Sequence, residues 1–135
     1  MPFNASPRVG PRGGSARENA EMIEKNQQDG TAPVYRVDKF AVPQEAREEF
    51  VARVVETHEV LRRQPGFVRD LLLEQESGPG KFNLVTMVEW QSQDAIDRAR
   101  PVVRAMHESR GFDPQALMKR LGIRADIANY RRFAD

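Results

Sequence analysis

From residue 34 onward, the spacing of apolar residues alternates between that of strands and that of amphipathic helices. Val34–Val42 is rich in β-branched and aromatic residues and stops at Pro43, which predicts a strand. Apolar residues then recur every three or four positions as far as Leu61, with Arg and Glu between them, and this is the period of an amphipathic helix. The two patterns together predict strands at 34–42, 67–75, 81–90 and 123–133, and helices at 44–63, from Ser92 or Asp94 to about Met106, and at 114–121.

The order of these elements is β-α-β-β-α-α-β, and the turn at 77–80 joins the second and third strands into an antiparallel hairpin. This order is typical of an α+β ferredoxin-like fold, a split βαβ arrangement in which an antiparallel sheet carries both long helices on one face. Pro101 lies inside the second long helix, and we expect it to kink that helix or to divide it.

The other face of such a sheet needs a cover, because apolar residues occupy both alternating phases of the hairpin strands. Leu71 is followed by Leu72, and Met87 by Val88, so one member of each pair must point away from the helices. The simplest cover is a second copy of the chain. We therefore expect a homodimer formed through the sheet faces.

The first 32 residues differ from the rest in composition, because Gly and Pro are concentrated there. Ser15 and Glu18 have the spacing of a capping box, which predicts one short helix over Ala16–Gln28. Its few apolar residues are too few to anchor a core. We expect residues 1–32 to be a flexible arm and residues 33–135 to be the folded domain.

The composition excludes several classes of function. Lys and Arg total 21 against 20 Asp and Glu, so no net field favours nucleic acid or an anionic membrane. The chain has no Cys, no apolar run of membrane-spanning length, no phosphate-binding Gly-rich loop and no His or acidic spacing typical of a metal site. We expect a soluble, cytoplasmic protein without metal or cofactor.

Two short motifs resemble those of the antibiotic biosynthesis monooxygenase domain family. Pro65-Gly66-Phe67 matches the family's start of the second strand, and Trp90-Gln91-Ser92-Gln93-Asp94-Ala95 matches its exit from the third. The resemblance implies a dimeric α+β barrel with a cavity between sheet and helices in each protomer. Some members oxidise electron-rich phenolic compounds with O2 and no cofactor, others act on quinones or haem, and many have no established activity.

Three residues are candidates for chemistry in that cavity. Trp90 can stack on a planar substrate or simply fill space beside the helix. His58 lies on the apolar stripe of the first helix, where it is either a base for a phenolic proton or a buried structural histidine. His107, at the edge of the second helix, is the better placed of the two for the mouth of a pocket.

Asn83 and Tyr35 lie within predicted strands and are expected to line either the cavity, as substrate-binding residues, or the sheet-to-sheet interface. Haem binding through His107 is disfavoured, because the resemblance places Asp38 and a small residue near Ala99 where haem-degrading members have Asn and Trp. The leading hypothesis is a cofactor-independent monooxygenase-like protein acting on a small phenol or quinol-type aromatic. The alternative is a non-catalytic dimeric module that binds a small ligand or serves in a stress response.

Overall fold

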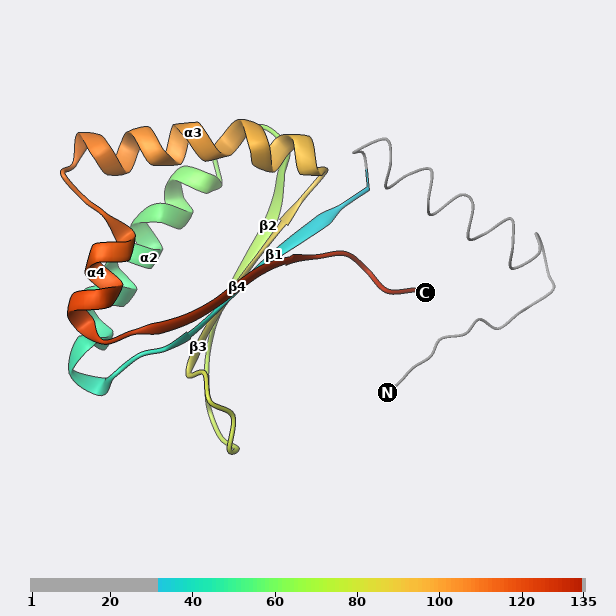
Figure 1. The fold of residues 1–135 in the computed structure, drawn as a ribbon. Coiled ribbons are helices and arrows are strands. Elements are labelled where there is room, and N and C mark those ends of the chain that lie inside the picture. Colours follow the sequence, from blue (N-terminus) through green and yellow to red (C-terminus); the bar gives the residue numbers. More distant parts are fainter. Residues whose placement is uncertain (1–31, 135) are drawn as a thin grey trace.

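A computed structural model describes residues 32–134, so the predicted helix over Ala16–Gln28 lies outside the described residues. For residues 32–134, Figure 1 shows one antiparallel sheet with the helices packed on one of its faces. This arrangement confirms the α+β ferredoxin-like fold. The elements in chain order are β1 (Val34–Ala41), the short 3-10 helix η1 (Gln44–Ala46), α2 (Arg47–Leu61), β2 (Phe67–Glu74), β3 (Leu84–Trp90), α3 (Gln93–Ser109), α4 (Pro114–Leu121) and β4 (Arg124–Tyr130).

The first residues of α3 and α4 follow side chains that cap the free backbone amides, and α4 ends at a glycine. Ser92 caps α3 by accepting a hydrogen bond from the amide of Ala95 at 3.2 Å. Asp113 caps α4 in the same way, with Pro114 as the first helical residue, and Gly122 ends that helix at a φ of 72°. Local sequence signals therefore determine these boundaries.

The expected division of α3 at Pro101 does not occur, because the helix runs without interruption through this residue. Pro101 is exposed, so water can satisfy the carbonyl one turn earlier that loses its amide partner. Ala95, Ile96 and Ala99 are buried on the same helix and hold it against the sheet. Packing therefore outweighs the loss of one backbone hydrogen bond.

The strand order is β2-β3-β1-β4, with β1 and β3 in the centre. In β3 the side chains alternate strictly, and Leu84, Thr86, Val88 and Trp90 are the buried set. Through the register, these residues share the helix-covered face with Val34, Arg36, Asp38 and Phe40 of β1 and with Asp70, Leu72 and Glu74 of β2. Residues 81–83 lie before β3, so this strand is shorter than predicted.

The opposite face of the sheet carries no helix among residues 32–134 (Figure 1). Its apolar residues include Leu71, Leu73, Val85 and Met87, and the side chains of Leu71 and Leu73 are 44% and 49% exposed. This confirms that apolar residues occupy both phases of the hairpin.

The buried apolar residues form two separate clusters under the helices. One joins β1, α2 and α4 around Phe40 and Phe50, whose rings meet edge to face at 4.9 Å. The other joins β3 to the start of α3 around Trp90 and Ala95. No buried apolar side chain belongs to both clusters.

Candidate functional site

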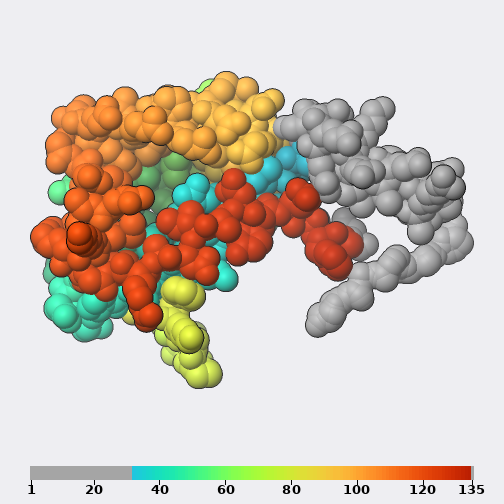
Figure 2. Space-filling view, viewed as in Figure 1, coloured from blue at the N-terminus to red at the C-terminus, as the bar shows by residue number. Residues whose placement is uncertain are grey.

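The space between the two clusters is a pocket of about 660 Å³, which is within the range of small-molecule sites. Its floor is the helix-covered face of the sheet, and its walls come from α2, α3 and α4. In Figure 2 it is seen as a hollow between α3 and β4. Most of its surface is apolar, and a few polar side chains project into it.

Trp90 lines the end of the pocket where β3 meets α3. Its side chain is only 3% exposed, and Phe67 packs edge to face against it with ring centroids 5.9 Å apart. Phe67 pairs with Trp90 across the strands, so the Phe of the first motif and the Trp of the second meet directly. Trp90 is therefore both a core residue and a pocket wall.

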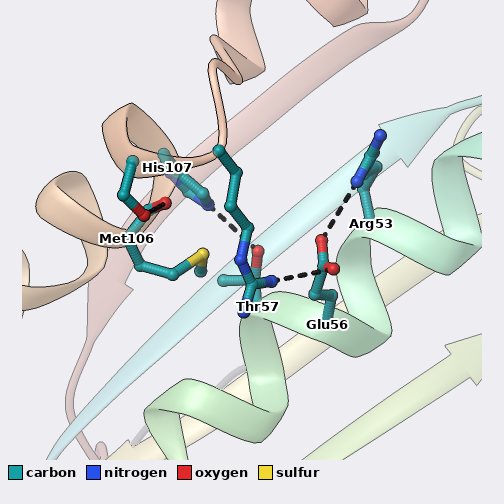
Figure 3. Close-up of polar contacts among 7 residues, drawn as sticks. Arg53, Glu56, Thr57, Met106 and His107 are labelled. Carbon is teal, nitrogen blue, oxygen red and sulfur yellow. Dashed lines mark hydrogen bonds and ion pairs between the residues drawn. The ribbon is translucent and has the colours of Figure 1, made fainter.

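His107 lines the pocket from the last turn of α3. Its Nε2 shares a hydrogen bond of 3.2 Å with the hydroxyl of Thr57 on α2, as Figure 3 shows. The ring also meets Phe112 edge to face at 5.0 Å. Burial lowers the pKa of His107, Glu56 raises it and Arg110 lowers it further, and the net shift is downward. His107 is thus held neutral in conditions where a free imidazole would begin to take up a proton.

A group of charged residues joins α2 to the end of α3 beside His107. The carboxylate of Glu56 binds Arg53 at 3.2 Å and Arg110 at 2.8 Å, and Figure 3 shows Glu56 next to Thr57 on the same helix. The guanidinium of Arg53 also lies over the Phe112 ring, 5.1 Å from its centroid. These contacts hold the middle of α2 against the end of α3 at this side of the pocket.

His58 lines the pocket from α2 and is 5% exposed. Its Nδ1 lies 2.9 Å from Oδ2 of Asp70 on β2, and Nε of Arg62 lies 2.9 Å from the same oxygen. Burial raises the pKa of the Asp70 carboxyl, but the hydrogen bonds and charges of His58 and Arg62 lower it to below its ordinary value. Asp70 is therefore a carboxylate at neutral pH.

Sequence reasoning missed most of the polar floor of the pocket. Arg36 and Asp38 lie side by side on β1, with Nε of Arg36 donating to Oδ1 of Asp38 at 2.7 Å, and Thr86 of β3 is buried beside them. The signal was present in the alternation of β1, because Arg36 and Asp38 are in phase with the buried Phe40. Only the register shows that this phase faces the helices.

Two of the predicted substrate-binding residues lie away from the pocket. Tyr35 is in the other phase of β1, on the open face of the sheet, and its hydroxyl accepts a hydrogen bond from Arg132 at 3.1 Å. Asn83 accepts a hydrogen bond from the Val42 amide and donates one to the Val42 carbonyl, both at 2.8 Å. The expectation that they line the cavity is therefore not met: one faces away from it, and the other ties the hairpin to the end of β1.

Neither a metal centre nor a membrane span is found in the described part of the chain. No group of three or more His, Cys, Asp or Glu side chains among residues 32–134 is arranged to hold a metal ion. No helix in the same range is both long and apolar enough to cross a bilayer.

A family model for antibiotic biosynthesis monooxygenases matches residues 33–109, which is more than half of the chain. The chain belongs to the antibiotic biosynthesis monooxygenase family. The match covers β1 to α3, and so contains every histidine and tryptophan discussed above. The ferredoxin-like fold expected from the order of elements and the family expected from the two motifs are confirmed.

Solved structures of the same fold include a cofactor-independent oxygenase and a heme-degrading protein. SnoaB, a cofactor-independent oxygenase from Streptomyces nogalater, is 27% identical, with a TM-score of 0.56 over 77% of this chain and 96% of SnoaB. The heme-degrader MhuD from Mycobacterium tuberculosis, with two hemes bound in its active site, is 20% identical, with a TM-score of 0.56 over 76% of this chain and 97% of MhuD. A conserved protein from Methanosarcina mazei is 19% identical, with a TM-score of 0.59 over 78% and 98%. Comparison with curated proteins gives no significant match.

Proposed function

We propose that this member of the antibiotic biosynthesis monooxygenase family oxidises a small electron-rich aromatic, a phenol or quinol, with O2 and no cofactor. The observation that carries the proposal is a largely apolar pocket of about 660 Å³ that is lined by Trp90 and by both histidines of the chain. The likeness of this chain to SnoaB, a cofactor-independent oxygenase with 27% sequence identity, supports the same reaction class.

The chemistry needs little from the protein beyond a base and a dry, shaped pocket. A histidine, His58 or His107, takes the phenolic proton, and the resulting electron-rich anion transfers electrons to O2. When the oxidised carbon is a methylene activated by a phenol ring, both of its carbon–hydrogen bonds break and a carbonyl forms. One oxygen atom of O2 becomes the carbonyl oxygen, and the other leaves as water with the two hydrogens. The methylene supplies all the electrons that reduce O2, so no external reductant is consumed. The apolar walls exclude water, and Trp90 orients the ring.

The alternative is a non-catalytic module of the same fold that binds a small aromatic ligand. One observation favours it: most of the pocket surface is apolar, and only a few polar side chains are present to carry chemistry.

We further propose that two copies associate through their open sheet faces. Leu71 and Leu73 on β2 and Val85 and Met87 on β3 would be covered in such a dimer. A contiguous apolar sheet face of this kind is rarely left in water, which supports the proposal. Each pocket lies on the other side of its own sheet and would stay accessible.

The experiment is O2 uptake by metal-free protein against anthrones, catechols and hydroquinones. We expect one substrate class to consume O2 without added metal or reductant, and His107→Gln and Trp90→Phe to slow it. Glu74→Gln is the matched control, because Glu74 is 58% exposed and pairs with Arg47 away from the pocket lining. Aromatics that bind in the pocket but consume no O2 would reject catalysis and leave the binding module.

A further inference from the structure

His58 and Asp70 form a buried hydrogen-bonded pair at the wall of the pocket. The side chain of His58 is 6% exposed and that of Asp70 is 11% exposed, and their contact joins α2 to β2. Asp70 itself is not part of the pocket lining, whereas His58 is. The carboxylate therefore lies behind the ring, on the side away from a ligand.

The pair determines which nitrogen of His58 carries the hydrogen. A carboxylate only accepts hydrogen bonds, so the ring nitrogen 2.9 Å from Asp70 must be the donor. Arg62 donates to the same carboxylate oxygen and keeps it ionised. A neutral His58 then has its hydrogen on Nδ1 and a free lone pair on Nε2. No described residue makes a hydrogen bond or ion pair with Nε2.

Other ionisable groups around the ring leave this assignment unchanged. On α2, Arg62 binds Asp70. On β1 Arg36 and Asp38 pair with each other, and on α3 His107 bonds to Thr57. Arg100 and Arg104 of α3 line the pocket and form no hydrogen bond or ion pair with His58, and Arg100 pairs with Asp97. Asp70 is the carboxylate that orients the ring.

We propose that Asp70 is a positioning residue that holds His58 in the Nδ1–H form, so that Nε2 accepts the hydrogen of an acidic hydroxyl on an aromatic ligand. The proposal rests on the pocket being the ligand site named above, and it goes further by assigning the accepting atom and the ligand group. A ligand must bring a hydroxyl donor to this point. A phenol fits it, and the corresponding methyl ether does not.

The same pair gives His58 the geometry of an oriented base. Its imidazolium, formed when Nε2 takes the phenolic proton, faces a buried carboxylate that stabilises the new charge. His107 has Thr57 in place of a carboxylate, and its neutral form is favoured by burial. A base oriented by a third group is the arrangement that general-base catalysis uses.

The first measurement is the protonation pattern of the ring nitrogens by 15N NMR of the full chain at pH 7.5. The chain has two histidines, so the spectrum of His107→Gln assigns the remaining signals to His58. We expect wild-type His58 to be protonated at Nδ1 and bare at Nε2. In Asp70→Asn the amide can donate to Nδ1, so we expect a shift toward the Nε2–H form. Glu74→Gln, on the same strand and face, should leave the pattern unchanged.

The second measurement separates a positioning role from a merely structural one. Saturating 1-naphthol should move the Nε2 signal of His58, and 1-methoxynaphthalene should not. Asp70→Asn should weaken 1-naphthol binding about tenfold, the effect of one good hydrogen bond, and leave 1-methoxynaphthalene binding unchanged.

A wild-type His58 protonated at Nε2, or an Nε2 signal that 1-naphthol does not move, overturns the proposal even if Asp70→Asn fails to fold. If no substrate consumes O2 but the NMR and binding measurements are as expected, the oxygenase function is rejected and the assignment of His58 and Asp70 stands.

Discussion

Gly66 is the position where a single methyl group tests the packing of the fold most directly. It joins α2 to β2 with a φ of 91°, and a Cβ built there would lie 2.3 Å from Cβ of Ala95 in the first turn of α3. Its carbonyl also accepts a hydrogen bond from the Gln91 amide at 2.8 Å. The junction before β2 and the start of α3 are therefore in direct contact. This explains why both motifs carry a small residue at this point.

Gly66→Ala combines two costs. A left-handed φ costs a non-glycine residue about 1–2 kcal/mol. Forcing an extra methyl into a packed contact costs about 1–3 kcal/mol more. We expect the free energy of unfolding to fall by about 2–5 kcal/mol.

Gly78→Ala is the matched control for the first cost. Gly78 has a φ of 98° and no heavy atom within 4 Å of the built Cβ, so only the backbone cost of about 1–2 kcal/mol applies. Adding Ala95→Gly to Gly66→Ala removes the atom in conflict. The two changes together should therefore cost less than the sum of the single changes.

Urea unfolding followed by the fluorescence of Trp90 is the assay, because Trp90 is the single tryptophan and is buried in the folded state. All variants are compared at one protein concentration, since association shifts apparent stability. The contact would be refuted if Gly66→Ala and Gly78→Ala lowered the free energy of unfolding equally. It would also be refuted if adding Ala95→Gly restored none of the free energy lost in Gly66→Ala.

Three further predictions concern the core, the open face and pH. Trp90→Ala should lower the free energy of unfolding by about 3–5 kcal/mol through the cavity it leaves, and Trp90→Phe by less than about 1.5 kcal/mol. If the indole N–H binds the ligand, isothermal titration should show weaker binding by Trp90→Phe, whereas a purely packing role leaves binding unchanged. Met87→Asp, on the open face, should give a monomer in analytical ultracentrifugation, and Leu72→Asp, on the helix-covered face, should not. A monomeric wild-type protein at micromolar concentration would contradict the dimer. The folded-state pKa of His107 is lowered, so the unfolded chain binds more protons there and this stabilisation is lost as pH falls below about 6.5. Between pH 7.5 and pH 5.5 the free energy of unfolding should fall less in His107→Gln than in the wild type. An equal fall in both proteins would contradict the lowered pKa.

The sequence by itself determined the order and most boundaries of the elements, because these depend on local signals. Ser92 and Asp113 accept hydrogen bonds from the free amides at the start of their own helices, and Gly122 ends its helix. The alternation of apolar residues sets each strand. The ferredoxin-like order and the family motifs follow from the same local information. Apolar residues in both strand phases also indicated that a second face needs a cover.

The tertiary structure decided which phase faces the helices, and with it the content of the site. The sequence of β1 does not show whether the strand phase of Tyr35 or that of Arg36 faces the helices. Only the pairing with β3 places Arg36 in the pocket and Tyr35 outside it. The same holds for contacts between distant residues. Thr57 and His107 are 50 positions apart, and no local pattern brings them within 3.2 Å. His58 could be seen as a candidate from its helical stripe, but its orientation depends on Asp70, which comes from the next strand. Side-chain chemistry at a site is a property of register and packing, which a one-dimensional pattern does not contain.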